Sequence, residues 1–433
     1  MSVSRVSCLI LVALAACTGN ATAQAAPLRT LVVLLTGGPE PLTRAEMRSL
    51  VFDDVSGFLS TASFGTTSLV GEVTPWIRPP FNPDCAQAPL RAGDGREAAR
   101  AAGYDPSGYE RVIYLIPTSV GCRLGYASRA ESGVQEIAIF GWLRTEPILH
   151  ELGHTFGMEH AGLWNGCSGN PLSVAYQLCV MEGDPYDPMS NNENVGDYNA
   201  FEKFAAGWLA NVTRVDTNGE YTIDLLEQQS SLPQALVVET ARNSYWFDHR
   251  EPVANDARLA GSSLLDGLMV HVGSNPHEPI ERSSYYSPVF ARMKSVLNLL
   301  YRNPTGSGSD AVRPGETFSE RGAFSLTVLS HVGTSVTARF AWTDQTRPKA
   351  PRITIRIRGR AASVAWAKAA EAGSGVAQYD IRLDGRARPP VSAAGPRAVR
   401  FPSLGRGRHR VSITAIDRAG NRGTPATRAF RIR

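Results

Sequence analysis

Residues 150–160 read His-Glu-Leu-Gly-His-Thr-Phe-Gly-Met-Glu-His. On a helix, His150 and His154 are four residues apart and project from one face, one turn above the other. Gly157 allows the left-handed turn that ends such a helix and brings His160 back as a third ligand. Three imidazoles can bind one zinc ion at about 2.0–2.1 Å and leave its fourth position to water, as in catalytic zinc sites.

Glu151 lies next to the first ligand, too close along the chain to bind the same ion comfortably. Its carboxylate can instead reach a water bound to that ion, whose pKa zinc lowers to about 7. Glu151 is then placed as general base, taking the proton as the water attacks a carbonyl and passing it to the leaving amine. This chemistry is amide hydrolysis. A closed structural zinc site is disfavoured because no cysteine lies among the ligands.

The N-terminus predicts export. Arg5 precedes an apolar stretch from Val6 to Ala16, and small residues follow. A cut after Ala23 gives a signal peptide of residues 1–23 and a secreted protein, which we expect. The alternative is a lipobox ending at Cys17, with a signal of residues 1–16 and a lipid anchor in a bacterial envelope. No later stretch is long and apolar enough to span a bilayer, so we expect no transmembrane helix in the mature chain.

Four cysteines follow the signal, and an even number in an exported protein predicts disulfides. We expect the pairs Cys85–Cys122 and Cys167–Cys179. The second pair would close a short loop just after the zinc ligands and stiffen the wall of the cleft.

The charges are unevenly distributed. Residues 348–433 carry 19 Lys and Arg against 4 Asp and Glu, so the whole-chain totals of 44 and 40 leave 25 against 36 for residues 1–347. Of the 19 cations, 17 are arginine. Such a basic domain favours an anionic surface or polysaccharide as partner, the alternative being arginines that only decorate exposed strand faces. We expect no specific nucleic-acid recognition.

The apolar patterns of the first half predict an α+β catalytic domain over residues 27–212. Residues 161–200 are rich in Gly, Asn, Ser, Pro and Asp, which predicts irregular structure. The expected strands are Leu28–Leu35, Thr67–Val73 and Arg111–Ile116, and the expected helices are Thr43–Ser60, Leu143–Phe156 and Phe201–Leu209. Thr43 followed by Glu46 predicts a capping box at the first of these helices.

From Thr213 the pattern changes to short alternating runs, which predict an all-β accessory domain of sandwich type over residues 213–343. A helical insertion is expected at Met293–Leu300. After a proline-containing linker, residues 348–433 predict another sandwich of seven strands. The expected strands of the two domains are Tyr221–Leu225, Ala235–Thr240, Ser244–Arg250, Leu268–Val272, Phe324–Leu329 and Ser335–Trp342, then Arg352–Ile357, Ser363–Trp366, Ala377–Leu383, His409–Ile416 and Arg428–Ile432.

The zinc motif resembles that of the metzincin metalloproteases, with each motif position matched. That resemblance implies a methionine turn beneath the metal, for which Asp187-Pro188-Met189-Ser190 is the candidate, with Met189 as an apolar floor that does not bind the ion. Within this group the chain is most similar to the gametolysin-like peptidases. That likeness is carried by residues 63–69, His160-Ala161-Gly162, residues 183–189 and 207–209, and the runs 245–250 and 266–268. It implies a zinc-dependent endopeptidase with one catalytic Zn²⁺ that acts on extracellular proteins.

The chain departs from well-known metzincins in two respects: no tyrosine lies two positions after Met189, and we find no long propeptide with an inhibitory cysteine before the first strand. Tyr186 and Tyr198 are candidates for stabilising the oxyanion. The last domain resembles fibronectin type III or bacterial Ig-like modules, on the basis of residues 373–377, Asp384-Gly385, residues 415–421 and the core candidate Trp366. The remaining histidines are expected to be strand-surface or hydrogen-bonded residues rather than ligands: His249, His271, His277, His331 and His409.

Two other functions use the same residues. A surface-binding protein or adhesin could keep the metal site as scaffold, although it would not need a base at Glu151. A zinc amidase or deacetylase could act on cell-wall material with the same metal chemistry.

Overall fold

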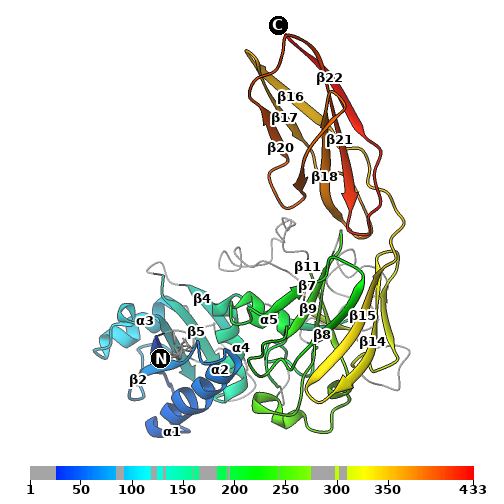
Figure 1. The fold of residues 1–433 in the computed structure, drawn as a ribbon. Helices are drawn as coiled ribbons and strands as arrows, with labels where there is room; N and C mark the ends of the chain where they lie inside the picture. Colours follow the sequence, from blue (N-terminus) through cyan, green and yellow to red (C-terminus); the bar gives the residue numbers. More distant parts are fainter. Residues whose placement is uncertain are drawn as a thin grey trace, which may run out of the picture.

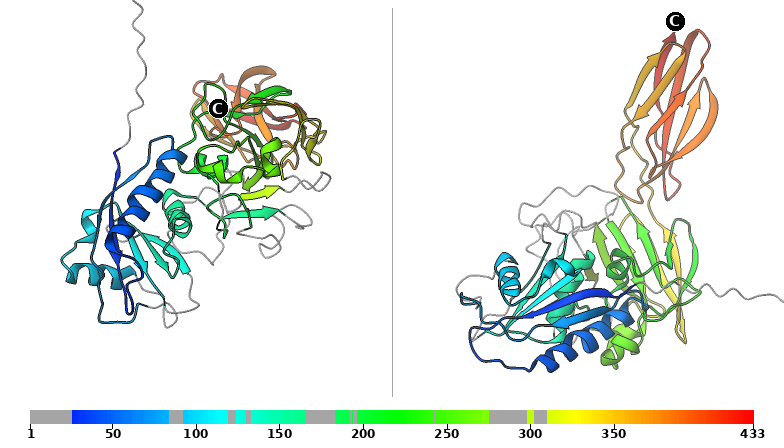
Figure 2. Two further views of the ribbon diagram at one scale, coloured as in Figure 1. Left: turned by 90° about the horizontal axis from the view of Figure 1, so that it is seen from below. Right: turned by 90° about the vertical axis from the view of Figure 1, so that its left-hand side faces the viewer.

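A computed structural model describes residues 26–83, 92–118, 124–129, 133–158, 160–164, 183–191, 193, 196–241, 243–274, 298–301 and 310–433. Its three regions are a mixed α/β part, an all-β part beside it, and a β module that projects away with the C-terminus at its far end (Figure 1). Figure 2 shows the same arrangement from two further directions. The expected signal peptide, Cys17, His277 and the four disulfide cysteines (Cys85, Cys122, Cys167 and Cys179) lie outside the described residues.

The mixed α/β region is built on a five-stranded sheet of order β2-β1-β3-β5-β4, in which only β4 runs antiparallel to its neighbour. The strands are β1 Leu28–Leu34, β2 Leu69–Val73, β3 Arg111–Ile116, β4 Leu124–Arg129 and β5 Gln135–Phe140. The helices are α1 Arg44–Ser49, the π-helix η1 Leu50–Val55, α2 Ser56–Ala62, α3 Ala92–Ala101, the 3₁₀ turn η2 Pro106–Gly108, α4 Thr145–Phe156 and α5 Ala200–Ala205.

Both faces of this sheet are covered by helices. Successive side chains of β1 point to opposite faces and therefore contribute to two different cores. Val32 and Leu34 belong to the core formed with α1, α2 and α4, whereas Leu31 and Val33 belong to the core beneath α3. The capping box predicted at Thr43 and Glu46 is confirmed, since each side chain accepts from the backbone N–H of the other. No helix among the described residues is long and apolar enough to cross a membrane.

The all-β region consists of two sheets that share one apolar core. Their orders are β6-β12-β11-β10-β9-β7 and β13-β14-β15-β8. The strands are β6 Ala161–Trp164, β7 Val212–Arg214, β8 Gly219–Ile223, β9 Ala235–Glu239, β10 Asn243–Asp248, β11 Met269–Ser274, β12 Asn298–Tyr301, β13 Thr317–Glu320, β14 Phe324–Val332 and β15 Ser335–Trp342, with 3₁₀ turns η4 Ala254–Leu259 and η5 Ser263–Asp266.

Three predictions of secondary structure are wrong in this part of the chain. Residues 161–164 form strand β6 rather than irregular structure. The end of the expected helix Met293–Leu300 forms strand β12 instead, and β12 pairs in parallel with β6. Their pairing joins the predicted catalytic and accessory domains in one sheet, so the boundary at residue 212 does not separate two independent units. The helix expected at Phe201–Leu209 ends at Ala205, because Gly207 adopts a left-handed φ of 78°.

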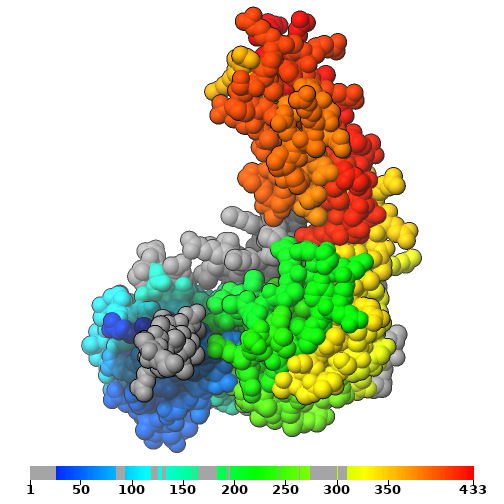
Figure 3. All heavy atoms as spheres, viewed as in Figure 1, coloured from blue at the N-terminus to red at the C-terminus, as the bar shows by residue number. Residues whose placement is uncertain are grey.

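The C-terminal module has the seven strands predicted from the sequence, arranged as two sheets around one core. The strands are β16 Ile353–Arg358, β17 Ala361–Trp366, β18 Val376–Leu383, β19 Arg386–Ser392, β20 Ala398–Phe401, β21 Gly407–Asp417 and β22 Ala426–Ile432. The sheet orders are β16-β17-β20 and β19-β18-β21-β22. In the space-filling view the module forms a separate lobe (Figure 3).

Candidate metal centre

Helix α4 places the first two imidazoles, and its end places the third. Ile148, Leu149 and Leu152 are buried on the side of α4 that packs in the core, which fixes the rotation of the helix. Gly157 ends α4 in the left-handed conformation, with φ 91° and ψ 18°, as predicted. The structure brings His150, His154 and His160 together, with one ring nitrogen of each within 4.8 Å of the others.

Backbone carbonyl groups orient these imidazoles. His150 Nδ1 lies 3.0 Å from Pro188 O and 3.2 Å from Ser190 O, and His154 Nδ1 lies 3.0 Å from Met158 O. A carbonyl only accepts, so Nδ1 carries the proton in both rings and Nε2 keeps its lone pair. His154 Nε2 and His160 Nε2 lie 3.1 Å apart.

Burial keeps the three rings neutral. It lowers the pKa of His150, lowers that of His154 well below its ordinary value, and lowers that of His160 to about 4. The neighbouring imidazoles add to this effect at His154 and His160, because protonation of one ring disfavours protonation of the next. Neutral imidazoles with free lone pairs are the form that binds a metal ion.

Glu151 occupies the same cleft. It is only 7% exposed, and the backbone of Gly125 in β4 lies directly against its carboxylate. A Cβ atom added at Gly125 would lie 2.3 Å from Glu151 Oε1, so the Glu151 side chain would have to move. Gly125 is therefore a residue of the site that the sequence analysis missed, because nothing in the local pattern links it to a carboxylate 26 positions later.

Met189 packs against α4, the helix that carries His150 and His154. Its side chain is fully buried, and a Cβ atom added at Gly153 in α4 would lie 2.2 Å from Met189 Sδ. The sulfur therefore lies against the helix between the first two histidines. Pro188 and Ser190, on either side of Met189, provide the carbonyl groups that orient His150. The turn thus supports both the floor and one ligand, and the second of these roles was not predicted.

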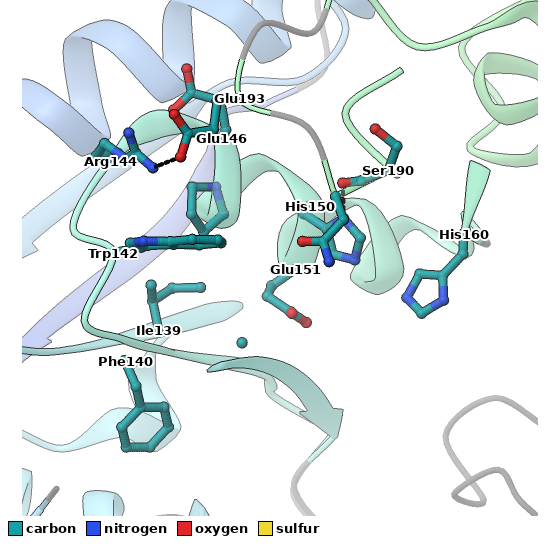
Figure 4. A pocket seen from close by; sticks show the side chains of 13 residues that line it. Ile139, Phe140, Trp142, Arg144, Glu146, His150, Glu151, His160, Ser190 and Glu193 are labelled. Carbon is teal, nitrogen blue, oxygen red and sulfur yellow. Dashed lines mark hydrogen bonds and ion pairs between the residues drawn. The ribbon is translucent and has the colours of Figure 1, made fainter. Parts of the chain in front are cut away.

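The cleft in front of these residues has a volume of about 280 Å³. Ile139, Phe140 and Trp142 line one part of it, and Arg144 forms an ion pair of 2.8 Å with Glu193 at another. In Figure 4 the side chains of Glu151, His150 and His160 point into a common space, with Ile139 and Trp142 on the side away from His160. The arrangement combines three neighbouring imidazoles, a buried carboxylate and an apolar wall.

The all-β region holds the segment that carries Met189. Each contact joins a residue of 183–200 to one beyond residue 247, and several are buried. They are His271 Nε2 to Asp184 Oδ2 at 3.1 Å, Tyr186 Oη to Asp310 Oδ2 at 2.6 Å, Arg250 Nη2 to Asp197 O at 2.6 Å, and Ala200 N to Asp248 Oδ2 at 3.2 Å.

The two tyrosines proposed as oxyanion stabilisers do not have that role in this structure. Tyr198 is fully buried and donates its hydroxyl to Leu149 O at 3.0 Å. Tyr186 donates its hydroxyl to Asp310, and burial together with this carboxylate raises its pKa to about 12. Both hydroxyls are bound elsewhere, and neither residue lines the cleft.

The other histidines differ in their surroundings. His409 Nδ1 lies 2.7 Å from Asp384 Oδ2, and His271 is buried and paired with Asp184, so both have hydrogen-bond partners as expected. His249 and His331 also have hydrogen-bond partners, Gly267 O at 3.0 Å for His249 Nδ1 and Gly333 O at 3.0 Å for His331 Nε2. Their rings lie 4.4 Å apart between centroids.

Comparison with known proteins identifies no family model and no curated protein that matches the chain. Among solved structures, it is similar to the central fibronectin-III array of RIM-binding protein (17% identity, 21% of this chain and 36% of that chain, TM-score 0.18). It is also similar to the PKD1 domain of the Vibrio cholerae metalloprotease PrtV (12%, 20% and 98%, TM-score 0.17) and to domains d3–d4 of rat CD45 (12%, 37% and 88%, TM-score 0.18).

The chain thus spans about a third of the RIM-binding protein array. These likenesses relate part of the chain to fibronectin type III and PKD β-sandwich modules. At such low TM-scores, nothing about activity or ligands follows from them.

Proposed function

We propose that the chain is a secreted zinc-dependent endopeptidase of metzincin type that hydrolyses extracellular proteins. The observation that carries this proposal is the convergence of His150, His154 and His160 in one cleft with the buried carboxylate of Glu151. The methionine floor beneath the trio supports the finer assignment to the metzincins.

The donor set fits zinc. In a tetrahedral site with bonds of about 2.0–2.1 Å, neighbouring donor atoms are roughly 3.3 Å apart. His154 Nε2 and His160 Nε2 are 3.1 Å apart, and the Nδ1 atoms of His150 and His154 are fixed by backbone carbonyls, as metal-binding imidazoles usually are. A zinc ion held there would lower the pKa of a water molecule to about 7 and polarise the substrate carbonyl.

Glu151 supplies the proton transfers. Its carboxylate accepts the proton of the attacking water and returns it to the amine that leaves. Because the side chain is 7% exposed, its charge acts in a poorly solvated space, where electrostatic interactions are stronger than in water. The close backbone at Gly125 restricts where the carboxylate can lie, so the base is positioned before substrate binds.

A protein substrate fits the surroundings of these groups. β4 is the last strand in the order of its sheet, and an extended peptide can add to a strand edge through main-chain hydrogen bonds. The apolar wall of Ile139 and Trp142 favours an apolar side chain next to the bond that is cut.

The test replaces the base without changing the shape of its side chain. We expect Glu151→Gln to bind zinc as the parent does and to lose casein cleavage by roughly 10²–10⁴-fold, the usual contribution of a general base. Glu220→Gln is the matched control, since Glu220 is half-exposed and pairs with Arg339 far from the cleft. Zinc-loaded Glu151→Gln that cleaves casein at the parent rate would refute the proposal.

The same preparations distinguish the alternatives. An adhesin with a residual metal site would show no hydrolysis that depends on Glu151. A zinc amidase would release fragments from peptidoglycan while leaving unstructured protein intact.

We also propose that the C-terminal module binds an anionic polysaccharide. Three arginines share the outer face of the sheet β16-β17-β20. Arg356 and Arg400 lie on either side of Ser363 in neighbouring strands. Arg358 is two positions after Arg356 in β16 and therefore points to the same face. These three, the outer-face arginines, are exposed. The rest of that face is Thr354, Ala361, Ser363, Ala365 and Ala398.

This face suits acidic groups repeated along a polymer. It holds no carboxylate, so none of its guanidinium groups is neutralised by a neighbour on the same face. It also holds no aromatic side chain on which a base could stack, which favours a polysaccharide over a single-stranded nucleic acid.

A further inference from the structure

A second group of metal-ligand side chains lies in the all-β region, away from the cleft. His249 and Glu251 follow β10, which belongs to the six-stranded sheet, and His331 is in β14 of the four-stranded sheet. One ligand atom of each lies within 4.8 Å of the others. His249 is fully buried, whereas the Glu251 and His331 side chains are 25% and 23% exposed, so an ion can reach the group from solvent.

The distances within this group are those of a metal site. Glu251 Oε1 lies 3.2 Å from His249 Nε2 and 3.2 Å from His331 Nε2. Donor atoms bound to one tetrahedral zinc ion are roughly 3.3 Å apart, given bonds of about 2.0–2.1 Å. The spacing also matches the 3.1 Å between His154 Nε2 and His160 Nε2 in the cleft.

The protonation of His249 gives a second, independent reason. Its Nδ1 lies 3.0 Å from Gly267 O, so Nδ1 carries the proton and the lone pair of Nε2 faces the carboxylate of Glu251. Two acceptor atoms at 3.2 Å repel each other unless a proton or a cation lies between them. A divalent cation between the two atoms would be bound by both of them.

We propose that His249, Glu251 and His331 bind a second divalent ion, of the zinc class. Two imidazoles and one carboxylate suit zinc and neighbouring first-row metals, whereas calcium and magnesium prefer oxygen ligands alone. The ion joins the two sheets of the all-β region, because its ligands come from both, and it stabilises their packing. It is distinct from the ion in the cleft.

The competing arrangement is a hydrogen-bonded group without metal. His331 Nε2 also lies 3.0 Å from Gly333 O and would donate its proton there when no ion is bound. Metal binding therefore requires His331 to move its proton to Nδ1.

The experiment counts metal ions in the full-length chain. The parent, His331→Ala, Glu251→Gln and the control His409→Ala are equilibrated with Zn²⁺, freed of excess metal, and measured by elemental analysis. We expect His331→Ala and Glu251→Gln each to hold one zinc ion fewer than the parent, and His409→Ala to hold as many. His409 is the matched control because it pairs with Asp384 in the separate C-terminal module.

The comparison does not depend on the ion in the cleft. If the cleft binds no metal, the parent count falls by one but the difference between parent and His331→Ala remains. Equal counts in the parent and both site variants would overturn the proposal. Glu251→Gln keeps the shape of the side chain, so it decides the result even if His331→Ala fails to fold. Zinc should also raise the melting temperature of the parent more than that of either site variant.

Discussion

His271 provides the sharpest test of how the all-β region supports the segment that carries Met189. The imidazole is 1% exposed, with Nε2 3.1 Å from Asp184 Oδ2 and Nδ1 3.7 Å from Asp248 Oδ2. Burial alone would lower the pKa of His271, but the two carboxylates outweigh burial and raise it to about 9. The imidazolium is therefore held between the strands of the second region and the loop that leads to Met189.

The sign of the pH effect follows from proton binding. An unfolded histidine has a pKa of about 6.5, so between about pH 6.5 and pH 9 the folded protein holds a proton that the unfolded chain has released. The stabilisation is fully present below pH 6.5 and is lost as the pH rises through 9. A pKa higher by about 2.5 corresponds to about 3 kcal/mol of unfolding free energy.

Urea denaturation at a series of pH values measures this contribution. The parent and His271→Gln are compared in a chelator, because metal binding has its own pH dependence. We expect the difference in unfolding free energy between them to shrink by about 3 kcal/mol from pH 6.5 to pH 9. His409→Gln is the comparison variant: its hydrogen bond to Asp384 also raises the pKa of the imidazole, but His409 is not buried between two carboxylates, so the same change should be smaller. A difference between parent and His271→Gln that stays constant over this range would refute the reasoning.

Two further predictions concern the cleft and the C-terminal module. Gly125→Ala should lower kcat for casein by at least roughly tenfold, because the added Cβ would displace the Glu151 carboxylate. Gly38→Ala is the control, since Gly38 has open space around it and the substitution should leave kcat unchanged. Steady-state kinetics of the two variants tests this prediction. Replacing the outer-face arginines with alanine should abolish salt-sensitive retention on an immobilised anionic polysaccharide without lowering casein cleavage, and unchanged retention would refute that docking surface.

Features set by neighbouring residues were predictable from the sequence. The spacing of His150 and His154, the left-handed turn at Gly157 and the capping box at Thr43 each depend on a few consecutive positions. Five of the seven strands of the C-terminal module were equally accessible, because alternation of apolar residues is a local signal. β19 was missed because its residues are almost all exposed and carry no alternation, and β20 was missed because it is only four residues long.

Features that depend on distant residues were not predictable in the same way. The sequence could not show that His249 and His331 lie beside the same carboxylate, because only the packing of two sheets brings them together. The candidate tyrosines failed for the related reason that a hydroxyl takes whichever acceptor the fold places nearest, here Leu149 O for Tyr198. Sequence spacing limits which groups can meet within one helix and says little about contacts across the fold.

The domain boundary expected at residue 212 does not coincide with a boundary between hydrophobic cores. The pattern changes where helical periodicity gives way to strand alternation, but Phe201 and Leu209 pack in one cluster with Val237 and Trp246. His160 leads directly into β6, which pairs with β12, and Ala161 N donates to Met189 O at 2.8 Å. The third imidazole and the methionine floor are therefore attached to the sheet of the second region. We conclude that the candidate metal centre requires both regions, because the elements that fix its geometry lie on each side of the expected boundary.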